Sequence, residues 1–194
     1  AVIDTPAARI LLLDTNHPLG DFEGSVGQAQ LDWLDARLTE TDRMPGRIAL
    51  LASHHGTVSL TNTRGDDPQR RQADALTALL HRHPSVVAWL VGHRHLHAIQ
   101  AHAGPNGGFW EISTGALIDW PVQARAVELL RHPDGQLTIA CTLQDHGAAS
   151  DSPAGWHYQL ARRFAGAQAL RMQGTPGDGT VRLLHPRVGA PCRP

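Results

Sequence analysis

The sequence predicts an α/β fold in which parallel strands linked by crossover helices are followed by antiparallel strands. Two observations support this fold class. Short apolar runs alternate with helical repeats in the first half of the chain, and short strands joined by a turn fill the second half. The length of 194 residues is enough for one domain with a substantial core.

The first half alternates apolar strands with amphipathic helices. We expect strands at 9–15, 48–52 and 86–91, because each is a short apolar run that ends in polar or glycine residues. We expect helices at 28–38 and 69–83, where leucines recur at helical spacing. This order favours parallel pairing, which places ligand sites beyond the carboxyl ends of the strands.

The second half changes to shorter strands joined by turns. The expected strands are 97–102, 108–113, 124–131, 136–143 and a short one at 180–184. A turn at 132–135 makes an antiparallel hairpin of two of them. We expect residues 1–149 to form one domain, and residues 150–194, with a helix at 154–170, to be an extension that packs on it.

Composition excludes several classes of function. The formal net charge is -1 and no segment concentrates arginine, so nucleic acid is not expected as a general partner. No apolar run approaches the 18 or so residues of a membrane span, so no membrane partner is expected. Cys141 and Cys192 lie in no CxxC pattern, which gives no sign of a zinc knuckle or a disulfide framework.

Histidines cluster at the ends of two expected strands. His54 and His55 follow strand 48–52, and His93 and His95 follow strand 86–91. Imidazole is a good ligand for zinc, iron and manganese, so these four residues are candidate metal ligands. An isolated histidine at a strand end is more often a hydrogen-bonded loop residue, but the joint pattern favours a metal cluster. Gly92 would let the backbone approach this crowded site.

The segments 53–56 (SHHG) and 92–95 (GHRH), each after a buried strand, resemble the fourth and fifth motifs of the calcineurin-like metallophosphoesterases. Segments 28–38, 111–116 and 118–121 resemble an actinobacterial branch of that family. The resemblance implies that the chain is the C-terminal half of a metallophosphoesterase domain and forms part of its αββα sandwich. It also implies metal-dependent hydrolysis of small-molecule phosphate monoesters or diesters.

The same resemblance implies a ligand set. His54 and His93 would bind one metal ion and His95 a second, the ions being divalent or trivalent manganese, iron or zinc. His55 takes the variable position of the fourth motif and would stand behind the ligands. Gly56 occupies the place of the family's proline, which is a departure from the pattern.

The family's first three motifs are not found in this sequence. They supply the bridging carboxylate, an asparagine ligand and a histidine that acts on the transition state. Asp14, Asn16 and His17 lack the required neighbours, and we interpret them as turn residues. We therefore expect a partial site, inactive alone, whose partner is the missing N-terminal half of the same domain.

Two other interpretations stay open. The chain could be a non-catalytic metal-binding or structural domain. Alternatively, His93, His95 and His97 alternate as in histidine-triad nucleotide hydrolases, although Arg94 stands where that family has an apolar residue. Localisation is open as well: similar actinobacterial proteins are often exported, and a signal would lie upstream of Ala1.

Overall fold

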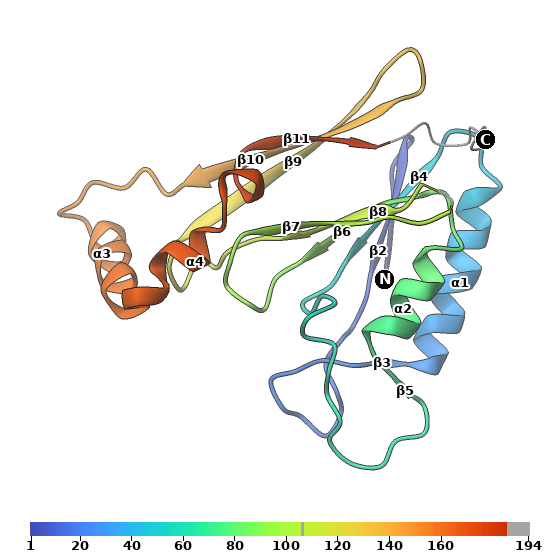
Figure 1. Ribbon diagram of the computed structural model, residues 1–194, viewed down its shortest axis with the longest axis horizontal. Helices are drawn as coiled ribbons and strands as arrows, with labels where there is room; N and C mark the ends of the chain where they lie inside the picture. The colour runs from blue at the N-terminus through green and yellow to red at the C-terminus, as the bar shows by residue number, and fades with distance from the viewer. Residues whose placement is uncertain (106, 186–194) are drawn as a thin grey trace.

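A computed structural model describes residues 1–105 and 107–185. These residues form a helical layer, two large sheets and a small two-stranded sheet (Figure 1). The larger sheet has six strands, in the spatial order β1 (Val2–Asp4), β2 (Ala8–Leu12), β4 (Ile48–Ala52), β6 (Val86–Val91), β8 (Phe109–Ser113) and β7 (Ala98–His102). Strands β2, β4, β6 and β8 are parallel, and the two edge strands are antiparallel to their neighbours. The predicted α/β class is confirmed.

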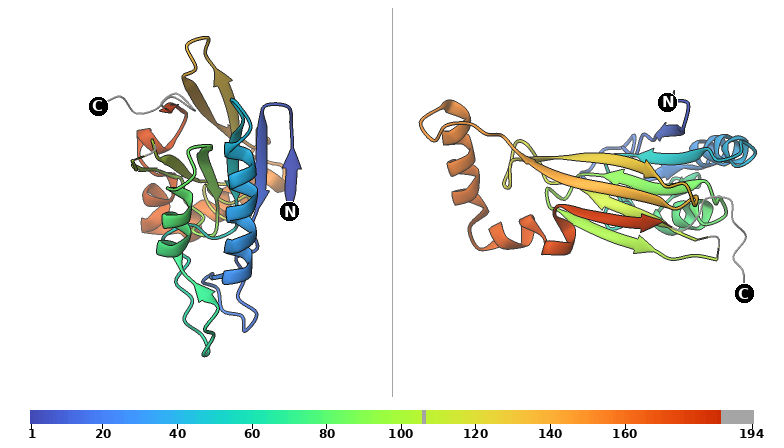
Figure 2. Two further views of the ribbon diagram at one scale, coloured as in Figure 1. Left: turned by 90° about the vertical axis from the view of Figure 1, so that its right-hand side faces the viewer. Right: turned by 90° about the horizontal axis from the view of Figure 1, so that it is seen from above.

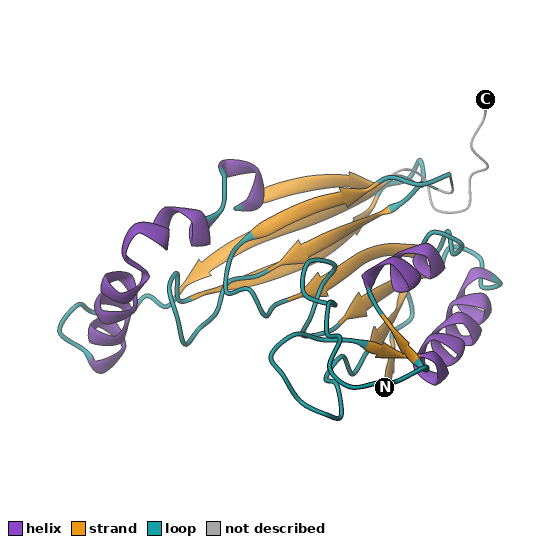
Figure 3. Cartoon of the chain, turned by 60° about the horizontal axis from the view of Figure 1, so that its bottom comes forward, coloured by secondary structure: helices purple, strands orange, loops and turns teal. Residues whose placement is uncertain are grey.

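Helices cover one face of this sheet and a second sheet covers the other (Figures 1 and 3). The helices are α1 (Gln28–Asp42) and α2 (Ala73–Leu80), and the second sheet contains β9 (Gln123–Arg131), β10 (Leu137–Asp145) and β11 (Val181–His185). Leu51 and Trp89 pack toward the helices, whereas Leu50 and Ala88 pack toward the second sheet. Burial on both faces explains why the central strands are continuous apolar runs.

The last helices lie beyond the end of the second sheet (Figures 1 and 2). They are α3 (Pro153–Ala165) and α4 (Ala169–Gln173), and the buried side chains of Trp120 and Val122 pack against α3. Between residues 1 and 185, apart from 106, no helix covers the outer face of the second sheet. In this part of the chain no helix is long and apolar enough to cross a bilayer.

Several element boundaries differ from the sequence prediction. The expected helix 69–83 is shorter, because Arg70–Arg71 (β5) pairs with Val26–Gly27 (β3) before α2 begins. The expected helix 154–170 is interrupted at Gly166, where the backbone is left-handed. Two short 3-10 turns follow α3 and α4, at Gly166–Gln168 and Pro176–Asp178.

The proposed boundary at residue 150 stays a prediction. Strand β11 lies after this boundary, yet it is hydrogen-bonded to β10, which lies before it. The end of the expected extension, 186–194, lies outside the described residues, as does Cys192.

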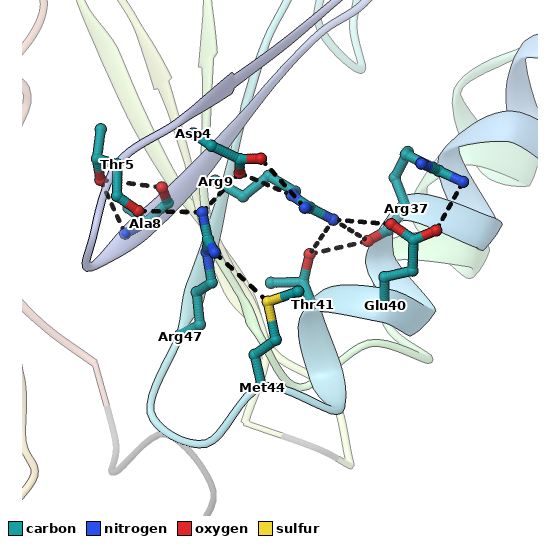
Figure 4. A network of polar contacts seen from close by, with 9 residues as sticks. All are labelled: Asp4, Thr5, Ala8, Arg9, Arg37, Glu40, Thr41, Met44 and Arg47. Atoms are coloured by element: carbon teal, nitrogen blue, oxygen red, sulfur yellow. Dashed lines mark hydrogen bonds and ion pairs between the residues drawn. The ribbon is translucent and has the colours of Figure 1, made fainter.

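A polar network ties β1 and β2 to α1 at the amino end of the sheet (Figure 4). Arg9 is only 7% exposed, and its guanidinium donates to Asp4 at 2.9 Å and to Glu40 at 3.1 Å. Arg47 donates to the same Asp4 at 2.6 Å. The hydrogen bond from Arg9 holds the pKa of Asp4 below its usual range. The edge strand is thus fixed by charged groups that all have partners.

Candidate metal centre

The structure brings His54 and His93 together at the carboxyl ends of two adjacent parallel strands, β4 and β6. His54 Nε2 and His93 Nδ1 lie 3.2 Å apart, with ring centroids 5.1 Å apart and ring planes at 81°. Two nitrogens bound tetrahedrally to zinc at about 2.0–2.1 Å lie about 3.3–3.4 Å from each other. The two nitrogens are therefore spaced as ligands of one ion would be.

Both of these histidines have lowered pKa values. Burial lowers the pKa of His54 most, and the positive charges of His55 and His95 lower it further. Burial also dominates the lowered pKa of His93, with His55 adding to the effect and the carboxylate of Glu23 opposing it. A neutral imidazole is the form that binds a metal ion, so this environment favours ligation.

His55 is buried next to His54 and His93. It is 3% exposed, and one of its ring nitrogens lies within 4.8 Å of ligand nitrogens of both His54 and His93. Its Nε2 donates to the Phe22 carbonyl at 2.9 Å, and its Nδ1 is 2.8 Å from the Thr15 hydroxyl. Both ring nitrogens of His55 already have partners. Its role behind the ligands stays a prediction.

His95 lies apart from the cluster. Its Nδ1 is 2.6 Å from Asp119 Oδ2, and its side chain is 37% exposed. His95 is close enough to lower the pKa of His54. It is not part of the group of possible ligands that His54, His55 and His93 form. Its assignment to a second ion stays a prediction.

The backbone is left-handed at both histidines of the 92–95 segment, with φ of 66° at His93 and 51° at His95. Such angles are uncommon for residues other than glycine and concentrate at functional sites. The expected role of Gly92 is wrong, because a Cβ there would meet its nearest neighbour, the His54 carbonyl, at an ordinary 3.8 Å. Crowding is found instead at Gly56.

Gly56 lies directly against the buried carboxylate of Glu111. A Cβ at Gly56 would lie 2.2 Å from Glu111 Oε1, which no ordinary packing allows. Glu111 accepts hydrogen bonds from the Thr57 backbone N–H at 2.9 Å and from the Thr57 hydroxyl at 2.8 Å. His102 Nε2 lies 2.8 Å from the same carboxylate. Glycine at position 56 thus leaves room for a carboxylate that holds the loop 53–57 in place.

The loop 16–25 contacts His55 and His93, and no sequence motif predicted these contacts. The Phe22 ring stacks on His93 with centroids 6.4 Å apart, and Glu23 Oε2 lies 3.7 Å from His93 Nε2. Asn62 anchors the loop by donating to the Gly20 and Glu23 carbonyls at 3.0 and 2.8 Å. No motif marks these residues, because they meet the histidines only after folding.

The other candidates have structural environments. Asp14 accepts a hydrogen bond from the Asn16 backbone N–H, as expected of turn residues, and His17 is buried beside Arg70. His97 is buried and lies within hydrogen-bond distance of Gln123. Because β7 begins only at Ala98, the three alternating histidines share no strand face, and the histidine-triad interpretation loses its basis.

A cavity of about 230 Å³ adjoins the two loops that follow β4 and β6 and carry the histidines. Gly56, Gly92 and Glu111 line the cavity, and Arg94 and Arg171 bring positive charge to it. Its apolar lining residues are Val58, Val91, Leu96 and Ala98.

Comparison with known proteins gives two matches to curated sequences. The chain is 31% identical over 96 residues to a probable cyclic nucleotide phosphodiesterase of Synechococcus sp. (strain WH7803), covering 50% of this chain and 36% of the relative. It is 30% identical over 93 residues to the glycerophosphodiester phosphodiesterase GpdQ of Enterobacter lignolyticus (strain SCF1), covering 48% and 32%. The matches thus span about a third of each relative.

A solved structure, a dimetal phosphatase from Danio rerio, aligns with a TM-score of 0.48 and 20% sequence identity over 69% of this chain and 54% of that chain. No protein-family model matches the chain.

Proposed function

We propose that this chain takes part in metal-dependent hydrolysis of phosphate esters. The resemblance to the calcineurin-like metallophosphoesterases, which the two sequence relatives support, is one basis for the proposal. The observation that carries the proposal is the 3.2 Å separation of His54 Nε2 and His93 Nδ1 at the carboxyl ends of β4 and β6. His54 and His93 would hold one ion, and His95 would contribute to a second.

The donor set fits a transition metal ion. Imidazole suits zinc, iron and manganese, and the lowered pKa values of His54 and His93 keep their lone pairs available near neutral pH. A bound ion would supply a Lewis acid for the phosphoryl oxygens. Arg94, next to His93 in the chain, adds positive charge for an anionic ester, and the adjoining cavity offers room for its organic group.

We further propose that the site is partial in this chain. Two or three imidazoles leave the charge of two ions uncompensated, and the described cluster of possible ligands contains histidines alone. The carboxylate and asparagine ligands that the family resemblance implies would come from an N-terminal half of the same domain. The chain by itself would then bind fewer than two ions and be inactive.

The test is metal content per chain by plasma mass spectrometry, together with hydrolysis of bis-(p-nitrophenyl) phosphate. The chain is compared with its His54→Ala and His93→Ala variants and with a form extended upstream. Binding that depends on both histidines, with activity only in the extended form, supports the proposal. Two ions and turnover in the short chain would overturn the partial site.

The same experiment separates a non-catalytic metal-binding domain from an enzyme. The clustered histidines alone would also suit such a domain. In that case the extended form would bind a single ion and would not hydrolyse the ester at any concentration of added metal.

A further inference from the structure

Glu23 has a carboxylate oxygen that the fold buries without a hydrogen-bond partner. Its Oε2 is inaccessible to solvent, and no described residue donates a hydrogen bond to it. His93 Nε2 lies 3.7 Å from this oxygen. A buried acceptor without a donor is costly, so its position calls for a physical account.

The two nitrogens of His93 face different partners. Nε2 faces the Glu23 carboxylate, and Nδ1 faces His54 Nε2 at 3.2 Å. A carboxylate accepts hydrogen bonds only, so it favours the tautomer of His93 that carries its proton on Nε2. That tautomer leaves the lone pair of Nδ1 directed at His54, where the ion would bind.

The position of Glu23 is fixed by its own loop. Its carbonyl accepts from Asn62 Nδ2 at 2.8 Å, and the next residue, Gly24, donates its N–H to the Ser59 carbonyl at 2.8 Å. The Phe22 ring stacks on His93 from the same loop. The loop thus places the Glu23 carboxylate at one edge of the His93 imidazole and the Phe22 ring against the face of the same imidazole.

We propose that Glu23 is a positioning residue of the metal centre, which orients His93 as the Nε2–H tautomer and offsets part of the charge of the bound ion. Metal-bound histidines generally donate their second N–H to an outer partner, often a carboxylate, and losing that partner weakens metal binding. The inference rests on the proposed function, because it requires an ion between His54 and His93.

The experiment measures zinc affinity of the chain by competition with a chromophoric chelator. Glu23→Gln keeps the shape and removes the charge, and Asp21→Asn removes the same charge from an exposed acid of the same loop. We expect zinc affinity to fall about 10- to 100-fold in Glu23→Gln. Asp21→Asn should stay within about twofold of the wild type, since exposed charges contribute little.

A second readout separates positioning from a merely structural role. Nitrogen-15 chemical shifts of the His93 ring in the metal-free chain report its tautomer, and a thermal melt reports folding. We expect the Nε2–H form in the wild type, a mixture of tautomers in Glu23→Gln, and a melting temperature of the metal-free Glu23→Gln chain no lower than that of the wild type.

The possible failures are distinguishable. If Glu23→Gln binds zinc like the wild type and keeps its tautomer, while His54→Ala and His93→Ala lose the site, the role of Glu23 is refuted and the proposed function stands. If those two alanine variants bind zinc as the wild type does, the metal centre itself is refuted, and the role of Glu23 with it.

Discussion

The two ends of the parallel strands handle their polar residues in opposite ways. At the amino end, Arg9, Asp4, Glu40 and Arg47 form a network in which every charged group has a counter-charge, although Arg47 Nε is buried without a hydrogen-bond partner. At the carboxyl end, histidine nitrogens face each other and a buried carboxylate oxygen lacks a donor. Polar groups at the first end stabilise the fold, whereas those at the second have a local cost that a ligand could offset.

The histidines at the two ends of the strands also differ, in the direction in which their pKa values are shifted. His83 precedes β6, and its two ring nitrogens lie 2.7 Å from Asp42 and 2.9 Å from Asp35. Burial lowers its pKa, but the hydrogen bonds to both carboxylates outweigh burial and raise it overall. His54 and His93 have lowered pKa values instead. One fold therefore holds histidines suited to carrying a charge and histidines suited to binding a metal.

The largest expected effect is the loss of metal at the carboxyl end. His93→Ala should reduce zinc affinity by more than the roughly 10- to 100-fold expected for losing an outer partner, because it removes a ligand itself. Stability without metal should hardly change. Isothermal titration calorimetry measures the affinity, and a urea melt with chelator measures stability. A large loss of stability in the metal-free chain would show that His93 stabilises the fold itself, which contradicts the proposed difference between the two ends.

Gly56 and Gly92 provide a matched pair within the histidine loops. Gly56→Ala drives a Cβ into Glu111 and should destabilise the chain by about 1–3 kcal/mol, as overpacking does. Gly92→Ala meets only the His54 carbonyl at 3.8 Å and should be close to neutral. Urea unfolding of both variants decides the matter. Equal effects would mean that Glu111 does not constrain the loop.

At the amino end, Arg9→Met should destabilise the chain by about 1–3 kcal/mol, because it removes hydrogen bonds from a buried guanidinium to two carboxylates. Arg37→Met is the control. Arg37 pairs with Glu40 at 2.6 Å, but both side chains are more than a third exposed. Surface pairs are worth about 0–1 kcal/mol, so chemical denaturation should show a smaller loss for this variant.

The smallest expected effect is a pH dependence of stability at His83. Its raised pKa stabilises the folded state fully below the unfolded value of about 6.5, and the contribution is lost as pH rises through the folded value. Urea melts at pH 6 and pH 9 should therefore differ more for the wild type than for His83→Gln. An identical difference in the two proteins would show that the raised pKa contributes nothing.

Much of the fold could be predicted from local patterns. Strands β4 and β6 have the predicted bounds, because buried parallel strands are continuous apolar runs. The helix expected at 154–170 was interrupted, since its interior contains Gly166, whose left-handed backbone ends α3. Propensity alone did not reveal the Arg70–Arg71 strand either, because its pairing with Val26–Gly27 is a contact made only by folding.

The candidate site was predictable only in part. The sequence indicated His54 and His93, and the family resemblance is supported by both curated relatives, although the actinobacterial branch is not. The ligand roles of His54, His93 and His95 stay predictions. Glu23 was not predicted, and Glu111 and Asp119 were predicted only as parts of resembling segments, without a role. Their contacts with the loops that carry the histidines are tertiary contacts, which no local motif reveals.

The left-handed backbone of His93 and His95 also limits which substitutions these positions can accept. Glycine, asparagine and aspartate adopt such angles most readily, whereas β-branched residues do so at a steric cost. In a saturation library sorted for folding alone, we expect asparagine and glycine to be enriched at both positions and valine and isoleucine to be depleted. Selection for metal binding would instead narrow the accepted residues to the few that can also act as ligands.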